Sequence, residues 1–291
     1  NINGTGVSSP VGSNIVTALG GTISTDNTTD AKFGNTDFRL HGGSTLLPDN
    51  SAVTTANTDR RLLNTTNLDL TSSTLRLIGD GGAATASSQT LASIDYYGGS
   101  TISLDTDATA ANARLTTLTT GSLNRFERGT LNIRNIQNTL STLGTTAGTQ
   151  KLILTANPTV TNGMIGANIA IWAGTNVNDP GDTRFATYNA THGVEAAAFG
   201  LTPTTAAALQ AATATQIVDF NNIAGTTTLT GNATMQALRL RTTATSQVLN
   251  SSTFTITLGA SAAANQGAGL QLIHTANDTV THPVNLAFGT Q

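Results

Sequence analysis

Apolar and polar residues alternate along many short stretches of this chain. Clear examples are residues 74–77 (TLRL), 130–133 (TLNI), 237–240 (ALRL) and 255–258 (TITL). A period of two is typical of β-strands that bury one face and expose the other. We predict strands at 37–40, 67–70, 74–78, 91–97, 101–104, 114–118, 130–133, 151–154, 168–172, 216–220, 226–229, 235–240, 253–258, 270–274 and 284–288.

The alternation also predicts which side chains point inward. In the strand at 235–240, Leu238 and Leu240 should face the interior and Arg239 should face solvent. A charge placed at Leu240 should therefore be costly, whereas a change at Arg239 should cost little.

The predicted strands are joined by short segments rich in Gly, Asn, Asp and Ser, which tolerate tight turns. Many short one-sided strands fit either a β-sandwich or a β-solenoid. A sandwich of this length would need linkers between domains, and no Pro-rich or charged linker is present. We therefore predict an all-β fold, a parallel β-helix with coils of roughly 20–25 residues. It should run as one segment over 1–291, with a weak division near residue 150.

One stretch departs from this pattern. Residues 202–212 (TPTTAAALQAA) offer Thr202 as a cap, Pro203 at the first helical position and a run of Ala. We predict either a short helix or a projecting loop there.

The most distinctive stretch is 166–194, which holds the only Trp, Trp172, and also Tyr188. Its apolar runs at 169–172 and 185–188 flank a turn-rich segment at 176–182. The two aromatic side chains could form a platform for stacking a sugar. We interpret them instead as a core staple at the point where a loop leaves the coils.

The second half of the chain resembles the autotransporter-associated β-strand repeats of large bacterial surface proteins. The resemblance rests on residues 165–172 (IGANIAIW), 185–188 (FATY), 193–194 (GV), 237–240 (ALRL) and 253–258 (TFTITL), and covers 150–291. It implies a right-handed parallel β-helix, exported to the cell surface, that acts as a stalk, adhesin or fibre. The first half matches only in the style of its strands.

The composition narrows the possible partners. Charged residues make up 10%, against roughly 25% in ordinary globular proteins, and the net charge is -3. Neither nucleic acid nor an anionic membrane is favoured as a partner. The absence of Cys leaves the redox compartment open, and no apolar run is long enough to span a bilayer as a helix.

Parallel β-helices also include polysaccharide lyases and glycoside hydrolases, so acidic residues need attention. A glycosidase requires two carboxylates about 5–10 Å apart, and a lyase requires a basic residue beside acids. We interpret all the candidates as turn residues or strand-end ion pairs, and predict that the chain is not an enzyme. An acidic cluster on one face of the solenoid would favour the enzyme instead. The candidates are Asp95, the pairs Asp105/Asp107 and Asp179/Asp182, and the clusters Asp59-Arg60-Arg61 and Asp37-Phe38-Arg39.

A calcium ion is the one cofactor with some support. Asn176, Asn178, Asp179 and Asp182 offer hard oxygen ligands within one loop, although the same residues also make an ordinary turn. We predict no catalytic residue and no cofactor, and keep calcium as the alternative. His192 beside a Gly is interpreted as a turn residue.

The two ends of the chain suggest assembly. The first residues lack Met and the features of a signal peptide, and Val284, Leu286 and Phe288 alternate as in a strand. We therefore expect both ends to pair with further chain, either flanking segments or other copies. The predicted function is a structural segment of an exported bacterial surface fibre or adhesin. The alternatives are a polysaccharide-active β-helix, either a lyase or a tailspike-type depolymerase, and a carbohydrate- or receptor-binding adhesin domain.

Overall fold

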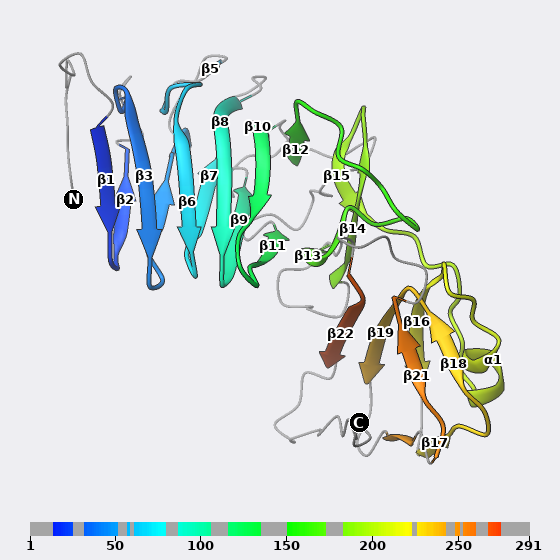
Figure 1. Cartoon of the computed structure of the whole chain (residues 1–291). Coiled ribbons are helices and arrows are strands. Elements are labelled where there is room, and N and C mark those ends of the chain that lie inside the picture. Colours follow the sequence, from blue (N-terminus) through cyan, green and yellow to red (C-terminus); the bar gives the residue numbers. More distant parts are fainter. Residues whose placement is uncertain are drawn as a thin grey trace. The chain divides into compact units, whose positions relative to one another are not determined.

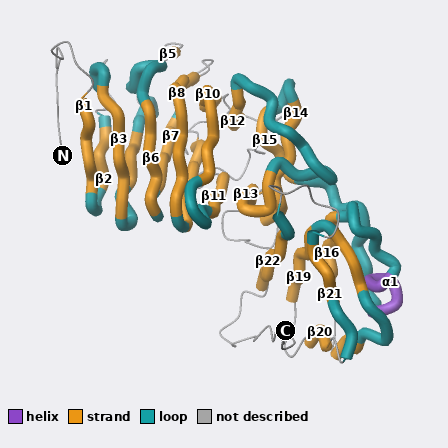
Figure 2. The backbone as a smooth tube through the Cα atoms, in the orientation of Figure 1, coloured by secondary structure: helices purple, strands orange, loops and turns teal. Residues whose placement is uncertain are grey.

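The computed structural model describes residues 14–25, 32–51, 57–58, 61–79, 87–105, 116–134, 150–172, 183–222, 226–242, 248–250, 253–259 and 267–274. The regular secondary structure of this described part consists of strands and one short helix, joined by loops (Figures 1 and 2). Strand pairs with a defined register occur from β1 (Asn14–Ala18) to β13 (Gly166–Trp172) and from β16 (Ile217–Asn222) to β22 (Gly269–His274). All of these pairs are parallel. The predicted all-β, parallel solenoid-like fold is thus confirmed, whereas its right-handedness stays a prediction.

The chain divides into two compact units. Unit 1 comprises Asn1–Pro158, Ile169–Val177 and Tyr188–Glu195, and unit 2 comprises Thr159–Asn168, Asn178–Thr187 and Ala196–Gln291. Strands β13 (Gly166–Trp172), β14 (Thr183–Asn189) and β15 (Gly193–Ala196) contribute residues to both. That the whole chain forms one continuous solenoid stays a prediction.

Two long sheets contain the strands of unit 1. The first has the order β1-β3-β6-β8-β10-β12, with β5 also pairing with β8. Its strands are β1 (Asn14–Ala18), β3 (Thr36–His41), β5 (Asn57–Thr58), β6 (Asn67–Thr71), β8 (Ser87–Tyr97), β10 (Thr116–Arg125) and β12 (Gln150–Leu154). The second has the order β15-β14-β13-β11-β9-β7-β4-β2. Its remaining strands are β2 (Thr22–Ser24), β4 (Thr45–Leu47), β7 (Thr74–Ile78), β9 (Gly99–Asp105) and β11 (Thr130–Arg134).

The core of unit 1 consists of apolar rows that run across its sheets. One row of in-register partners is Ile23, Leu46, Leu75, Ile102, Ile133 and Ile171, each at most 8% exposed. The first sheet adds the row from Phe38 through Leu68 to Ile94. Successive members of that row are 30 and 26 residues apart, which is longer than the predicted coil of 20–25 residues. The first coil, from Ile23 to Leu46, has the predicted length, with 23 residues.

Serine side chains at the corners between the two sheets form hydrogen bonds to the backbone of the preceding coil. Ser44, Ser73 and Ser100 stand in equivalent positions just before β4, before β7 and within β9. They donate hydrogen bonds to the carbonyls of Ala18, Leu40 and Leu70 at 3.1, 3.1 and 3.0 Å. These bonds satisfy buried backbone acceptors at the bends, where the strand ladder is interrupted.

Unit 2 has three smaller sheets and the helix. Its strands are β16 (Ile217–Asn222), β17 (Thr226–Thr228), β18 (Ala233–Met235), β19 (Ala237–Thr242), β20 (Val248–Asn250), β21 (Ile256–Leu258) and β22 (Gly269–His274). They form the sheets β16-β19-β22, β17-β20 and β18-β21. The strand predicted at 235–240 is therefore two strands. Gln236 interrupts it, and its backbone N–H donates to Gln216 O at 2.9 Å.

The stretch 202–212, for which we predicted either a short helix or a projecting loop, contains the short helix α1 (Ala206–Gln210). Its cap differs from the expected residue. The hydroxyl of Thr205, not that of Thr202, accepts a hydrogen bond from the N–H of Ala208. Leu209 is the buried residue of the helix and joins a core cluster with Val218, Phe220, Leu238 and Leu240. None of the described helices could span a bilayer.

The prediction that Arg239 faces solvent is wrong. Leu238 and Leu240 do face the core, at 2% and 5% exposure, but Arg239 on the opposite face is only 1% exposed. That second face carries its own buried cluster of Met164, Phe185, Ala197, Ile217 and Ala237. The alternation correctly predicted that Arg239 and the two leucines lie on opposite faces of the strand. The face that was expected to be exposed to solvent is covered by segments that are distant in the sequence.

Candidate functional site

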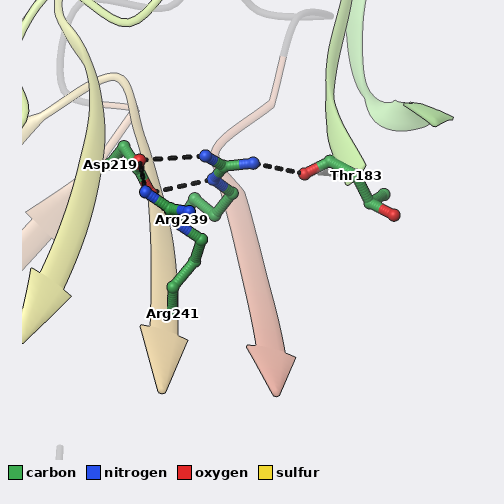
Figure 3. Close-up of polar contacts among 4 residues, drawn as sticks. All are labelled: Thr183, Asp219, Arg239 and Arg241. Atoms are coloured by element: carbon green, nitrogen blue, oxygen red, sulfur yellow. Dashed lines mark hydrogen bonds and ion pairs between the residues drawn. The ribbon is translucent and has the colours of Figure 1, made fainter. Parts of the chain in front are cut away.

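A buried charge cluster lies on the covered face of β16 and β19. Asp219 and Arg239 are in-register partners, so their side chains share a face. Arg239 donates from Nε to Asp219 Oδ1 at 2.8 Å and from Nη2 to Oδ2 at 2.9 Å. Arg241 donates in the same forked manner, from Nε at 3.0 Å and from Nη2 at 2.8 Å (Figure 3). One carboxylate thus accepts four charge-assisted hydrogen bonds.

The layer over this cluster comes from Thr183, Arg184, Phe185 and Phe199, which also belong to unit 2. Arg239 Nη1 donates to the carbonyl of Thr183 at 2.8 Å (Figure 3). The ring of Phe199 lies 4.2 Å from the Cζ atom of Arg239 and 5.3 Å from that of Arg184, so both contacts are cation–π interactions. Phe185 covers the neighbouring row, where a Cβ on Gly269 would collide with its ring. These contacts explain why Arg239 is buried.

Asp219 is held in its ionised form. Burial alone would raise its pKa, but hydrogen bonds from Arg239 and Arg241 and their charges outweigh burial and lower the pKa below its usual range. Burial likewise lowers the pKa of Arg239, with the Asp219 contacts opposing it. A carboxylate so fixed is unsuited to proton transfer at neutral pH. The cluster is therefore suited to holding structure or to recognising an anion.

A second array of polar side chains covers the outer face of β3, β6, β8 and β10 in unit 1. Arg39, Asp69, Asp95 and Asn124 follow one another in register across these strands. Arg39 Nε lies 3.3 Å from Asp69 Oδ2, and Asn124 Nδ2 donates to Asp95 Oδ1 at 2.7 Å. In the adjacent row, Asp37 accepts hydrogen bonds from Asn67.

This array brings together two carboxylates that the sequence left separate. Asp95 was a candidate by itself, but Asp69 was not singled out, because only the parallel pairing makes them neighbours. Burial, followed by the negative charge of Asp95, raises the pKa of Asp69, and Arg39 opposes the shift. The described residues contain no group of three His, Asp or Glu side chains that could hold a metal.

An aromatic pair adjoins these carboxylates. The rings of Tyr97 and Phe126 stack with centroids 4.9 Å apart and planes inclined by 15°, and Phe126 is 40% exposed. Tyr97 follows Asp95 by two residues, so both side chains lie on the outer face of β8.

No protein-family model, curated protein or solved structure matches the chain. The resemblance to autotransporter-associated repeats therefore stays a prediction.

Two further candidates from the sequence, Asp105 and Arg61, are both buried. Asp105 is fully buried, where it pairs with Arg76 Nε at 2.8 Å and accepts hydrogen bonds from Ser103. This geometry confirms the ion-pair interpretation of Asp105. Arg61 is also buried and donates from Nε to Asn50 Oδ1 at 2.8 Å. Asp107 and the neighbours of Arg61 at 59–60 lie outside the described residues.

The aromatic residues of the stretch 166–194 are anchored. Trp172 is 6% exposed, and the Tyr188 hydroxyl donates to the carbonyl of Leu154 at 2.9 Å. It also accepts from the Leu154 N–H at 3.2 Å. These contacts fit the interpretation of a core staple. His192 lies in a turn, as expected, with Nδ1 at 3.3 Å from Glu195 Oε2.

Two predicted residue sets cannot be placed. The calcium candidates Asn176, Asn178, Asp179 and Asp182 lie outside the described residues, as do the assembly residues Val284, Leu286 and Phe288.

Proposed function

We propose that this chain is a structural segment of an exported bacterial cell-surface fibre or adhesin, which assembles end to end by stacking of strands. The observation that carries the proposal is the open apolar row at β22. Val218, Leu238 and Leu270 are in-register partners, as are Phe220, Leu240 and Leu272. The first two members of each row are buried, but Leu270 and Leu272 are 39% and 46% exposed.

An exposed end of this kind favours addition of another coil. Within the described residues β22 pairs only with β19, so no described strand lies along its other edge, where a further parallel strand would pair. A strand added there would form backbone hydrogen bonds and cover both leucines. Each Å² of apolar surface removed from water would stabilise the contact by about 25 cal/mol.

The first described coil of unit 1 offers the complementary edge. Strands β1 and β2 each pair with a single described strand, β3 and β4 respectively. Ile15 of β1 and Leu19, which follows the end of β1, are 52% and 80% exposed. Contact between β22 of one copy and β1 of the next would be heterologous, and such a contact builds a filament rather than a closed dimer. Flanking segments of a longer chain would use the same edges.

The test is association of the isolated chain, followed by light scattering and electron microscopy. We expect assembly that grows with concentration and is lost in Leu272→Asp or Phe288→Asp. Val160→Asp is the matched control, because Val160 is similarly exposed, at 43%, but is not in either row. A monomer at high concentration, or equal assembly of Leu272→Asp and the control, would overturn the proposal.

The two carboxylates in the polar array on the outer face of unit 1 favour a second candidate function, a polysaccharide-active β-helix. Asp69 and Asp95 are on neighbouring strands, which lie about 4.8 Å apart, close to the carboxyl separation in retaining glycosidases of about 5 Å. The raised pKa of Asp69 would suit a general acid. Both side chains are, however, already engaged, by Arg39 and Asn124 respectively.

We therefore expect no hydrolase or lyase activity. Incubation with acidic and neutral polysaccharides, with and without calcium, should release neither reducing ends nor unsaturated sugars. Reproducible turnover that is lost in Asp95→Asn or Asp69→Asn, but kept in Asp37→Asn, would favour the enzyme.

A further inference from the structure

An exposed aromatic pair borders the polar array on the outer face of unit 1. Tyr97 of β8 and Phe126, which directly follows β10, stack with ring centroids 4.9 Å apart. Strand β12 pairs with β10 only as far as Thr120, so among the described residues Phe126 has no strand partner on the side away from Tyr97. The side chain of Phe126 is 40% exposed. Part of the aromatic surface is therefore within reach of a ligand from solvent.

The charges around this pair are mostly negative. Burial, followed by the negative charges of three carboxylates, raises the pKa of the Tyr97 phenol, and one guanidinium opposes the shift. The carboxylates are those of Asp69, Asp95 and Glu127, and the guanidinium is that of Arg39. Arg125 alternates with the array along β10, and its Nε donates to Gly129 O at 2.9 Å. The excess of negative charge favours a cationic ligand and disfavours an acidic one.

The two carboxylates of the array have oxygens to offer such a ligand. Asp69 uses Oδ2 toward Arg39, and Asp95 uses Oδ1 toward Asn124. In the part of the chain that the structure describes, Asp69 Oδ1 and Asp95 Oδ2 accept no hydrogen bond. The side chain of Asp69 is 31% exposed, and Asp95 is half-buried. Both carboxylates can therefore accept hydrogen bonds from a donor that arrives from solvent.

We propose that this face binds an oligomer of a protonated amino sugar, with one sugar ring on Phe126 and its ammonium group at Asp95 and Asp69. An exposed aromatic ring suits the apolar C–H face of a sugar and also attracts a nearby cation. The carboxylates suit ammonium and hydroxyl donors, with which they form charge-assisted hydrogen bonds. The array continues across strands that lie about 4.8 Å apart, which favours an extended oligomer over a single sugar. The site is independent of end-to-end assembly, since neither exposed leucine of β22 takes part.

The probe is chitotriose, the trimer of glucosamine, with its fully N-acetylated form as the matched neutral ligand. Calorimetry at about pH 6, where the amines are protonated, should show that chitotriose binds at least about tenfold more tightly than the acetylated form. Its affinity should fall as salt increases. Trilysine has a similar net charge but no sugar ring, and should bind at least about tenfold more weakly than chitotriose. Absence of chitotriose binding, or equal binding of chitotriose and either other ligand, would overturn the proposal.

Variants separate the aromatic and the acidic parts of the site. Phe126→Ala keeps all charges and should weaken chitotriose at least about tenfold while leaving trilysine unchanged. Asp95→Asn keeps the shape of the side chain and should weaken both cations. Glu195→Gln, in β15 of the other sheet, is the control for net charge. Equal affinities of Asp95→Asn and Glu195→Gln, or wild-type affinity of Phe126→Ala, with all variants folded by circular dichroism, would overturn the proposal.

Discussion

At the scale of single residues, the bends of unit 1 depend on the left-handed backbone conformation. Gly42, Ser72 and Gly98 precede β4, β7 and β9 with φ values of 58°, 50° and 58°. They occupy equivalent corners, since the N–H of Ser72 donates to Tyr97 O and that of Gly43 donates to Ser72 O. Residues with a Cβ adopt this conformation at a cost, which explains the glycine at two of the three corners.

The adjacent residues Gly98 and Gly99 provide a direct test. Gly98→Ala should destabilise unit 1 by about 1–2 kcal/mol, because of the left-handed conformation. In addition, the new Cβ would collide with Ser72 Oγ. Gly99→Ala should cost little, because the nearest atom to its Cβ, Thr130 Oγ1, is 4.0 Å away. The comparison is made by urea denaturation. Equal losses from the two substitutions would contradict this account of the corner.

Arg239 should be far more sensitive to substitution than an exposed arginine. Arg239→Met removes the nearer of the two cations over the Phe199 ring and two bonds to Asp219, so we expect a loss of about 3 kcal/mol. Arg39→Met is the control. Its side chain is 54% exposed in a pair with Asp69, and pairs of that kind contribute about 0–1 kcal/mol. Similar midpoints for the two variants would show that the cluster contributes little to stability.

The lowered pKa of Asp219 gives a pH dependence with a definite sign. The folded-state pKa lies below the unfolded value of about 3.9, so the contribution to stability is complete above that value. It is lost as the pH falls below about 4 toward the folded pKa. The free energy of unfolding of Asp219→Asn should therefore depend less on pH in that range than that of the wild type. If the free energy of unfolding fell equally in both proteins over this pH range, Asp219 would be excluded as the cause of the pH dependence.

At the scale of elements, β19 is buried on both faces. Leu238 and Leu240 pack in one cluster with Val218 and Phe220, while Arg239 faces Phe199. A strand in the middle of a three-stranded sheet, with a layer on each side, cannot turn either face to water. Substitutions on either face of β19 should therefore be costly.

Leu240→Asp tests the apolar face of β19. The change buries an unpaired carboxylate at a position that is 5% exposed, and we expect a loss of several kcal/mol. Thr257→Asp in β21 is the control, because Thr257 is exposed. The melting temperatures of the two variants are compared by thermal unfolding. If Leu240→Asp lowered the melting temperature no more than the control, the register of β19 would be wrong.

At the scale of the whole molecule, each unit has its own core. The rows of unit 1 and the clusters of unit 2 are made by different residues. In solenoids stability comes mainly from neighbouring coils, so damage should remain local. In Leu240→Asp, hydrogen exchange should accelerate in β16, β19 and β22 and stay unchanged in β3, β6 and β8. Uniform acceleration along the chain would indicate that the two units unfold together.

The fold class and many of the strands were predictable from the residue pattern alone, although β1, β2, β4 and β5 were not among the predicted strands. A period of two, with Leu and Ile on one side and Thr or Asn on the other, places Leu75 and Leu77 of β7 inside without knowledge of any partner. The Thr-Pro-Ala run likewise indicated a helix, with a projecting loop as the alternative, where α1 forms, because capping and helix propensity are local properties. Such features depend on residues a few positions apart.

Which faces are covered and which side chains meet depends on how distant segments pack together. Asp69 and Asp95 are neighbours because their strands pair in register, and Arg239 is buried because Thr183 and Phe199 cover it. Alternation says that Arg239 and Leu240 lie on opposite faces, but not what lies over each face. The covering segment is 40 or more residues away in the chain, and its position depends on packing that no local pattern encodes.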